Sequence, residues 1–220
     1  MYRLRADNMI TWVSPSMSGV KLYAQYSNGM GDDSVRDREK ERYALAGISY
    51  ETDKLAAMLF VDRVLKSHEH VSDIKDATAL SVGGHYKFDC GASVYLATQY
   101  GWNEDTLQFA DLTGGNWAKW SVGEFEGFAS TLGVNIPWSL GVFTVMGMYA
   151  DGDGTAYTGL GAGPVDKTHH DLSSKGMALA NLTFLSKRTF LYTGLAYKEK
   201  KDNDTKQDII QAALGVSHYF

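Results

Sequence analysis

The apolar and polar positions of the chain alternate with a period of two over most of its length. In the stretch 19–28, Val20, Leu22, Ala24 and Tyr26 alternate with Lys21, Tyr23, Gln25 and Ser27. Successive side chains of an extended strand point to opposite faces, so this period is that of a β-strand. The pattern predicts an all-β chain whose strands each have one apolar face and one smaller or more polar face.

Turn residues divide this pattern into about eleven strands. The predicted strands are residues 8–14, 19–28, 42–52, 55–65, 77–88, 92–101, 122–135, 140–151, 174–185, 190–199 and 209–220. Alternation does not assign the two faces of the stretch 55–65. Glycine, proline and charged residues supply the connections between the strands.

The predicted connections alternate between short and long. Short turns are expected near Ser16, Asp53, Cys90, Pro137 and Lys187, and long polar loops from about Gly29, Lys66, Trp102, Gly152 and Lys200. In an antiparallel meander this alternation puts all short turns at one end and all long loops at the other. That asymmetry is typical of an up-and-down transmembrane β-barrel.

Aromatic residues near the predicted strand ends fit the same fold. Such residues form girdles at the two membrane interfaces of β-barrels. The candidates are Trp12, Tyr26, Tyr50, Phe88, Tyr100, Trp102, Trp138, Tyr197 and Phe220.

Composition narrows the class of protein further. The 220 residues, 44% hydrophobic and 21% charged, fit one folded unit spanning 1–220. The longest unbroken apolar run, Leu55 to Val61, is too short for a membrane helix. A mean hydropathy of -0.25 still allows a barrel, because only alternate residues face lipid. The net charge of -5 argues against nucleic-acid binding, and the single Cys90 rules out an internal disulfide.

No motif indicates catalysis, a metal or a cofactor. The segment Asp151 to Asp153 lacks the later ligands of a calcium loop, and 159–163 lacks the spacing of a dinucleotide motif. His169 and His170 are adjacent and cannot easily face one ion. A Gly-x-Ser-x-Gly elbow is absent, so the chain is not expected to be an enzyme.

Three segments resemble the general diffusion porins of β-proteobacteria, including the neisserial type. Residues 5–15 resemble the segment that leaves the constriction loop and enters the sixth strand, although the family usually has Ser where Met9 follows Asn8. Residues 185–189, followed by Tyr192, resemble the turn before the fifteenth strand. The terminal segment 215–220 resembles the closing strand.

The resemblance implies that this sequence corresponds to strands six to sixteen of a sixteen-stranded barrel. The first five strands, the signal peptide and most of the constriction loop would then be absent from it. Eleven antiparallel strands would bring the first and last strands together in parallel. We therefore expect a curved partial barrel, or a narrow barrel with a weak seam.

The resemblance also implies a function: a water-filled channel for small hydrophilic solutes and ions in the outer membrane of a Gram-negative bacterium, without cofactors and assembled as a homotrimer. Basic residues of the polar faces or of the constriction-loop remnant are candidates for lining the pore, and they favour anions. These candidates are Arg3, Arg5, Lys21, Arg42, His85, Lys87 and Lys175. Alternate residues of the last strand, Leu214, Val216, His218 and Phe220, are the candidate signal for the barrel-assembly machinery.

Three alternatives stay open from the sequence. A lipocalin-like soluble barrel would turn its apolar face inward around a ligand. A truncated porin remnant would keep the fold without conducting. An outer-membrane enzyme on a similar barrel is disfavoured, since no nucleophile and base are clustered in the sequence.

Overall fold

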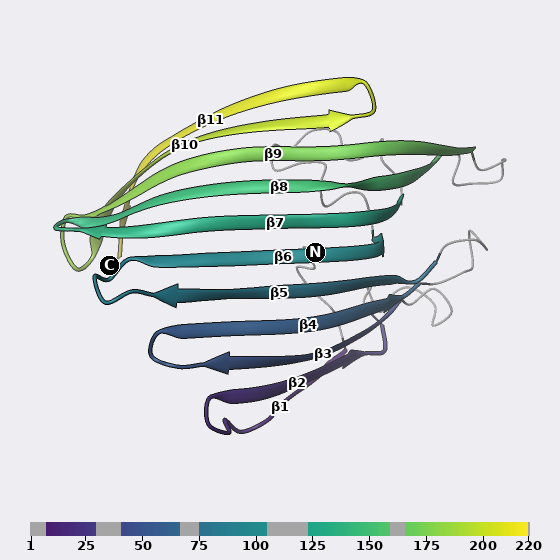
Figure 1. Ribbon diagram of the computed structural model, residues 1–220, viewed down its shortest axis with the longest axis horizontal. Coiled ribbons are helices and arrows are strands. Elements are labelled where there is room, and N and C mark those ends of the chain that lie inside the picture. The colour runs from purple at the N-terminus through teal and green to yellow at the C-terminus, as the bar shows by residue number, and fades with distance from the viewer. Residues whose placement is uncertain (1–7, 30–40, 67–74, 105–122, 159–165, 220) are drawn as a thin grey trace.

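The described residues form one antiparallel sheet of eleven strands that follow each other in sequence order (Figure 1). The computed structural model describes residues 8–29, 41–66, 75–104, 123–158 and 166–219. Among these residues, no helix is long and apolar enough to cross a membrane. The strands are β1 (Met9–Val13), β2 (Val20–Ser27), β3 (Arg42–Glu51), β4 (Leu55–Leu65), β5 (Ala77–Lys87), β6 (Ser93–Glu104), β7 (Gly123–Trp138), β8 (Gly141–Thr158), β9 (Asp166–Phe184), β10 (Thr189–Asp202) and β11 (Thr205–His218).

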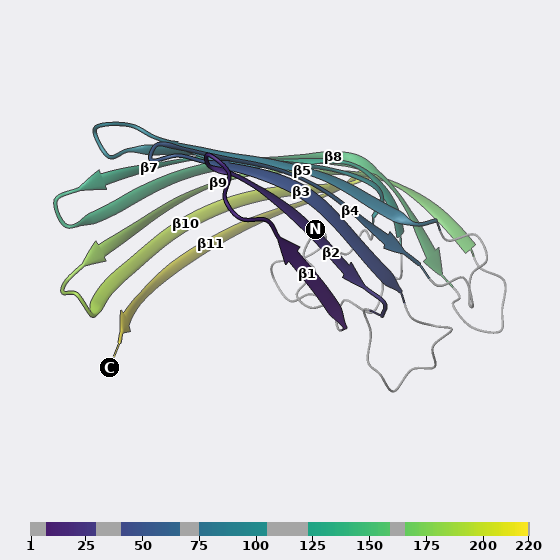
Figure 2. The same ribbon diagram turned by 90° about the horizontal axis from the view of Figure 1, so that it is seen from below.

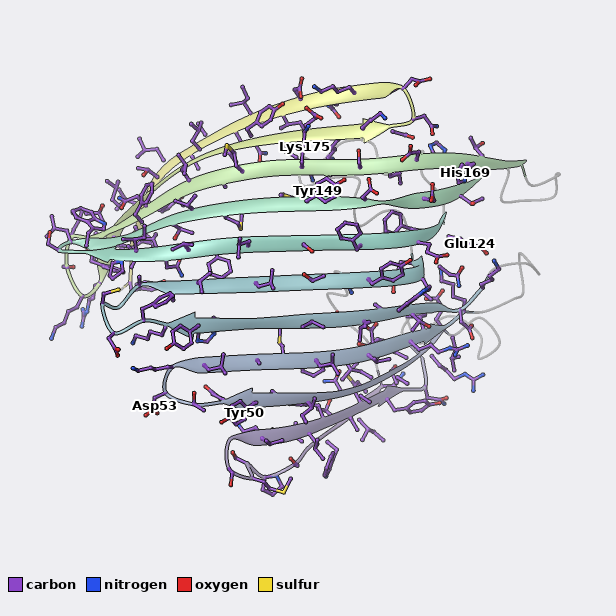
Figure 3. The ribbon with its side chains drawn as sticks, viewed as in Figure 1. Tyr50, Asp53, Glu124, Tyr149, His169 and Lys175 are labelled. Carbon is purple, nitrogen blue, oxygen red and sulfur yellow. The ribbon has the colours of Figure 1, made fainter. Side chains whose placement is uncertain are left out.

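The predicted fold class and strand order are confirmed. Each strand pairs antiparallel with the next, so the connections β1–β2, β3–β4, β5–β6, β7–β8 and β9–β10 lie at one end of the sheet. We call this the short-turn end and the opposite one the loop end. In Figure 3, Tyr50 and Asp53 mark the short-turn end, whereas Glu124 and His169 lie near the loop end.

Two predicted turns or loops are strands instead. Residues 136–138 continue β7, because Ile136 and Pro137 pair with Phe143 and Val142, and the turn shrinks to Ser139 and Leu140. The predicted loop 152–173 is wrong over most of its length. There β8 runs on to Thr158 and β9 begins at Asp166, paired residue by residue. Cross-strand hydrogen bonds overcome the low strand propensity of Gly and Asp here.

The predicted charged loop 200–208 is also wrong. A two-residue turn, Asn203 and Asp204, joins β10 to β11, with Asp202 opposite Thr205. Asn203 adopts a positive φ of 50°, which Asn tolerates better than most residues. Its backbone N–H donates to the Asp171 carbonyl at 2.8 Å, and its Oδ1 accepts from the Asp171 N–H at 2.9 Å. The tip of the hairpin is therefore held against β9.

The sheet of the described residues is strongly curved and does not close (Figure 2). In the described part of the chain β1 pairs only with β2 and β11 only with β10, so these strands form the two edges. The expected curved partial barrel is confirmed. A small buried cluster of Tyr43, Val64 and Ala77 lies near the loop end, where Met9 and Leu45 pack against it.

Candidate channel wall

Register and exposure distinguish two faces of the sheet. Along β2, Leu22, Ala24 and Tyr26 are exposed, whereas Lys21 and Tyr23 are half-buried. Side chains converge on the concave side of a curved sheet and shield one another, so the less exposed face is the concave one. Paired residues share a face, and the strand pairing extends this assignment from β1 to β11. It also settles β4, where Phe60 and Asp62 lie on the concave face and Leu59 on the convex face.

The convex face carries a continuous apolar band across the sheet. Between the aromatic residues at its two ends, no described residue on this face is charged. Thr98 and Ser130, two polar members of the band, bond to each other at 2.9 Å. Apolar members of the band include Leu22, Ile48, Leu59, Val61, Val82, Leu96, Leu132, Val145, Leu179, Leu195 and Leu214.

Aromatic residues border this apolar band at both ends. At the loop end the tyrosine hydroxyls donate to polar groups beyond the band: Tyr100 to Glu126 at 3.2 Å, and Tyr197 to Asp208 at 2.8 Å. At the short-turn end the Trp138 Nε1–H donates to Asn181 Oδ1 at 3.0 Å. At the loop end, an aromatic body against apolar surface with a polar tip beyond it suits a membrane interface.

The other predicted girdle residues divide between these two ends. By register or chain position, Trp12, Tyr50 and Phe88 lie at the short-turn end, and Tyr26 and Trp102 lie at the loop end. Phe88 contacts Tyr86 at a ring-centroid distance of 5.0 Å. Phe220 lies outside the described residues.

Charged residues of the convex face gather at the loop end and pair with one another. Arg63 and Asp76 lie 2.9 Å apart, and Glu199 contacts Lys175 at 3.1 Å and Lys206 at 2.7 Å. Lys175 and Tyr149 are register partners on β9 and β8, as Figure 3 shows. From the middle of a strand toward the loop end, the convex face therefore carries first the apolar band, then the border of aromatic residues, and then the charged residues.

In the middle of the sheet, the concave face carries mostly small and polar residues. In the rows that cross β5 to β9 the residues are mostly Gly, Ala, Ser, Thr and Gln. Two such rows are Ser81, Gln99, Ala129, Ala150 and Ser174, and Gly83, Ala97, Thr131, Met148 and Gly176. A face of this composition can line water.

The predicted pore-lining residues divide between the faces. Lys21, His85 and Lys87 lie on the concave face toward the short-turn end. Arg42 and Lys175 lie on the convex face at the loop end, where the strands have passed the apolar band and polar residues occupy both faces. Arg3 and Arg5 lie outside the described residues.

Sequence reasoning missed Lys198 and Lys200, which the register puts on the concave face of β10. The signal was present, because both lysines continue the alternation of Gly194 and Ala196: Lys198 lies within the predicted strand 190–199, and only Lys200 fell in the predicted loop. Asp62 on β4 also lies on this face. The concave face thus carries basic residues on β2, β5 and β10 and an acidic residue on β4.

The two adjacent histidines point to opposite faces, as expected for one strand. His169 Nε2 lies 3.4 Å from Asp153 on the convex face, and His170 Nδ1 lies 2.7 Å from Asp202 on the concave face. Asp151 and Asp153 belong to β8 rather than to a loop. Among the residues that the structure describes, no group of three or more His, Cys, Asp or Glu could hold a metal ion.

The described candidate assembly residues of the last strand lie on the convex face. Leu214 and Val216 are 75% and 63% exposed on the convex face, and His218 Nδ1 lies 2.8 Å from Thr189 Oγ1. The Tyr219 N–H donates to the Arg188 carbonyl at 2.9 Å, which ties the strand end to the preceding turn.

An apolar convex band between two aromatic borders, opposite a small polar concave face, defines a wall of a transmembrane β-barrel protein. A family model of Gram-negative porins matches residues 2–203. The chain therefore belongs to the Gram-negative porin family, which implies a non-enzymatic channel protein. No curated protein matches the chain.

Proposed function

We propose that this protein forms part or all of the wall of a water-filled channel in the outer membrane, through which small hydrophilic solutes and ions diffuse passively. The two-faced sheet carries the proposal. Its convex face excludes charge over the height of the apolar band, whereas the rows of its concave face that cross β5 to β9 consist mostly of Gly, Ala, Ser, Thr and Gln. A ligand-binding barrel of lipocalin type would need the reverse arrangement.

Strand direction restricts how the channel closes. Both β1 and β11 run toward the short-turn end, so direct pairing of these edges would be parallel. An unpaired edge leaves backbone groups in hydrocarbon at a cost of several kcal/mol each, roughly. We propose that an odd number of further strands, from outside these 220 residues, closes the sheet. Five such strands would complete the sixteen of the porins that the sequence resembles.

Sequencing the locus upstream of the codon for Met1 tests this arrangement. A reading frame that encodes a signal peptide and about five more alternating strands would support it. A start codon at that position with no such strands upstream would contradict it.

We further propose that the basic concave residues give a preference for anions. Lys21 and Lys87 are exposed or half-buried on the concave face and lie toward the same end of the sheet. Reversing both charges, Lys21→Glu with Lys87→Glu, is expected to shift the reversal potential in a salt gradient toward cation preference. The matched control is Lys54→Glu, in the turn between β3 and β4. An unchanged reversal potential in the double variant would contradict the anion preference.

Transport itself is tested by refolding the chain into phospholipid vesicles and measuring swelling in arabinose. Swelling above that of protein-free vesicles is expected. A folded protein that gives none would support the non-conducting remnant.

The family also supports three proposals about cell context: outer-membrane location, a homotrimer, and recognition of Leu214, Val216, His218 and Phe220 by the barrel-assembly machinery. Membrane fractionation tests the location. The protein mass in detergent micelles tests the homotrimer. The membrane yield of Val216→Asp tests recognition by the barrel-assembly machinery. A monomer mass, or normal yield of that variant, would contradict the corresponding proposal.

A further inference from the structure

Four aromatic side chains gather on the concave face where the last three strands reach the short-turn end. Phe190 and Tyr192 continue the alternation of Lys198 on β10 and therefore lie on the concave face. Phe184 on β9 is the register partner of Phe190, and Tyr219 at the end of β11 contacts Phe190 at a ring-centroid distance of 6.1 Å. In Figure 2 the turn between β9 and β10 and the end of β11 lie together at the left. We call Phe184, Phe190, Tyr192 and Tyr219 the aromatic patch.

The rings of the aromatic patch are accessible from the concave side. Phe184, Tyr192 and Tyr219 are 52%, 41% and 62% exposed. The Tyr192 ring lies across Gly215 of β11, where a built Cβ would overlap its Cζ and Oη, so no side chain at that position covers it. Lipid covers exposed apolar residues of the convex face, but it does not reach the concave face of a water-filled channel. A contiguous apolar surface that meets water commonly marks an interaction site.

The sequence around the aromatic patch carries positive charge and no negative side chain. The stretches 127–150, 172–198 and 209–220, which include the short-turn halves of β7 to β11, contain no Asp or Glu. The turn between β9 and β10 contributes Lys187 and Arg188, and both are exposed. These side chains make the local potential positive, which favours an anion as the ligand.

Arg188 lies at the border of the aromatic patch. Its carbonyl accepts a hydrogen bond from the Tyr219 N–H at 2.9 Å, so the two residues are neighbours on adjacent strands. Among the residues that the structure describes, neither Arg188 nor Lys187 has an acidic partner, whereas Lys54, in another turn of the same end, pairs with Asp89. A guanidinium group without an acidic partner, next to exposed rings, can hold a carboxylate while the rings hold an apolar body.

We propose that the aromatic patch, Lys187 and Arg188 bind small solutes that combine an aromatic ring with a carboxylate, of which benzoate is the simplest. The proposal rests on the channel function proposed above, because a water-filled concave side brings such a solute to the patch. The ring of the solute packs against the exposed rings at centroid distances of about 4.5–7 Å. The guanidinium group of Arg188 donates two parallel hydrogen bonds to the carboxylate.

Equilibrium dialysis of radiolabelled benzoate against the protein in phospholipid nanodiscs measures binding, and empty nanodiscs correct for partition into lipid. Benzoate should bind at least tenfold more tightly than acetate, which lacks the ring, and than benzyl alcohol, which lacks the charge. Acetate that binds as tightly as benzoate would mean that charge alone acts. Benzyl alcohol that binds as tightly would mean that apolar contact alone acts, and either result would overturn the proposal.

Substitutions locate the site. Arg188→Gln, in an exposed turn, should weaken benzoate binding at least fivefold, whereas Lys54→Gln, in another turn of the same end, should stay within twofold of the wild type. Phe184→Ala should weaken binding at least threefold. Its matched control is Phe143→Ala, which removes the same ring from the convex face and should have no effect. Unchanged binding in Arg188→Gln, or equal losses in the two phenylalanine variants, would refute the site.

The dialysis experiment needs no conduction, so the site and the channel can fail separately. Benzoate binding by a protein whose vesicles do not swell in arabinose would support the site and contradict the proposed channel. Swelling in arabinose by a protein that does not bind benzoate would support the channel and overturn the site.

Discussion

Neighbouring residues of β7 offer a direct test of the two-faced wall. Leu132 lies on the convex face, 55% exposed, midway between Phe128 and Trp138, whereas Thr131 points to the concave face. Arginine at the middle of the lipid face of a β-barrel costs about 2–4 kcal/mol. Leu132→Arg should therefore lower the folding equilibrium constant in a bilayer by roughly 30- to 700-fold, at 1.4 kcal/mol per tenfold. Thr131→Arg keeps its charge in water and should cost below about 1 kcal/mol.

Guanidinium unfolding in phospholipid vesicles, followed by tryptophan fluorescence, measures both variants against the wild type. Leu132→Ala separates the loss of the leucine side chain from the cost of the charge. Equal destabilisation by the two arginines would refute the face assignment, because register alone distinguishes residues one position apart. A larger cost for Thr131→Arg would mean that the concave face is buried instead.

Two further predictions concern glycine and turn geometry. Gly47→Ala should destabilise the sheet by about 1–3 kcal/mol, because the added Cβ overlaps Phe60 and approaches the Leu59 carbonyl. At Gly147 the added Cβ meets nothing within 4 Å, so the stability of Gly147→Ala should be within about 0.5 kcal/mol of that of the wild type. Equal melting temperatures for the two variants would contradict this contrast. Asn203→Ala puts at φ 50° a residue that tolerates the left-handed region less well than asparagine, and it removes the bond to the Asp171 N–H. A loss of about 1–2 kcal/mol and faster hydrogen exchange at Asp171 are therefore expected. Asn203→Gly relieves the backbone but should exchange equally fast, and protection retained in both variants would rule out the side-chain bond.

Most of the strands were predictable because alternation is local. The alternating stretch 77–88 corresponds to β5 (Ala77–Lys87) to within one residue. Most errors fall where strands of the loop end contain Gly and Asp, as at 152–155, or charged residues, as at 200–202. The error at 136–138 lies at the short-turn end, where Pro137 indicated a turn. These residues have low strand propensity, and only pairing with a neighbouring strand keeps them extended.

The candidate wall was predictable only in part. Polarity alone selected Lys21, His85 and Lys87, which lie on the concave face, together with Lys175, which does not. Beyond the apolar band both faces meet water, so the presence of a lysine there does not predict which face of the sheet it lies on. The proximity of the Tyr95 ring to Gly133 was not predicted, because the two residues are distant in sequence and meet only through register.

The sequence by itself determined the class of fold, the number and order of the strands, and which residues of each strand share a face, because all of these follow from a period of two along a single strand. Tertiary structure decided which face is concave, which residues pair across strands, and that β1 and β11 stay apart. Those features depend on hydrogen bonds between strands and on the accumulated curvature of the whole sheet. No local pattern encodes them, since moving one strand by two residues leaves its own alternation unchanged and changes every partner.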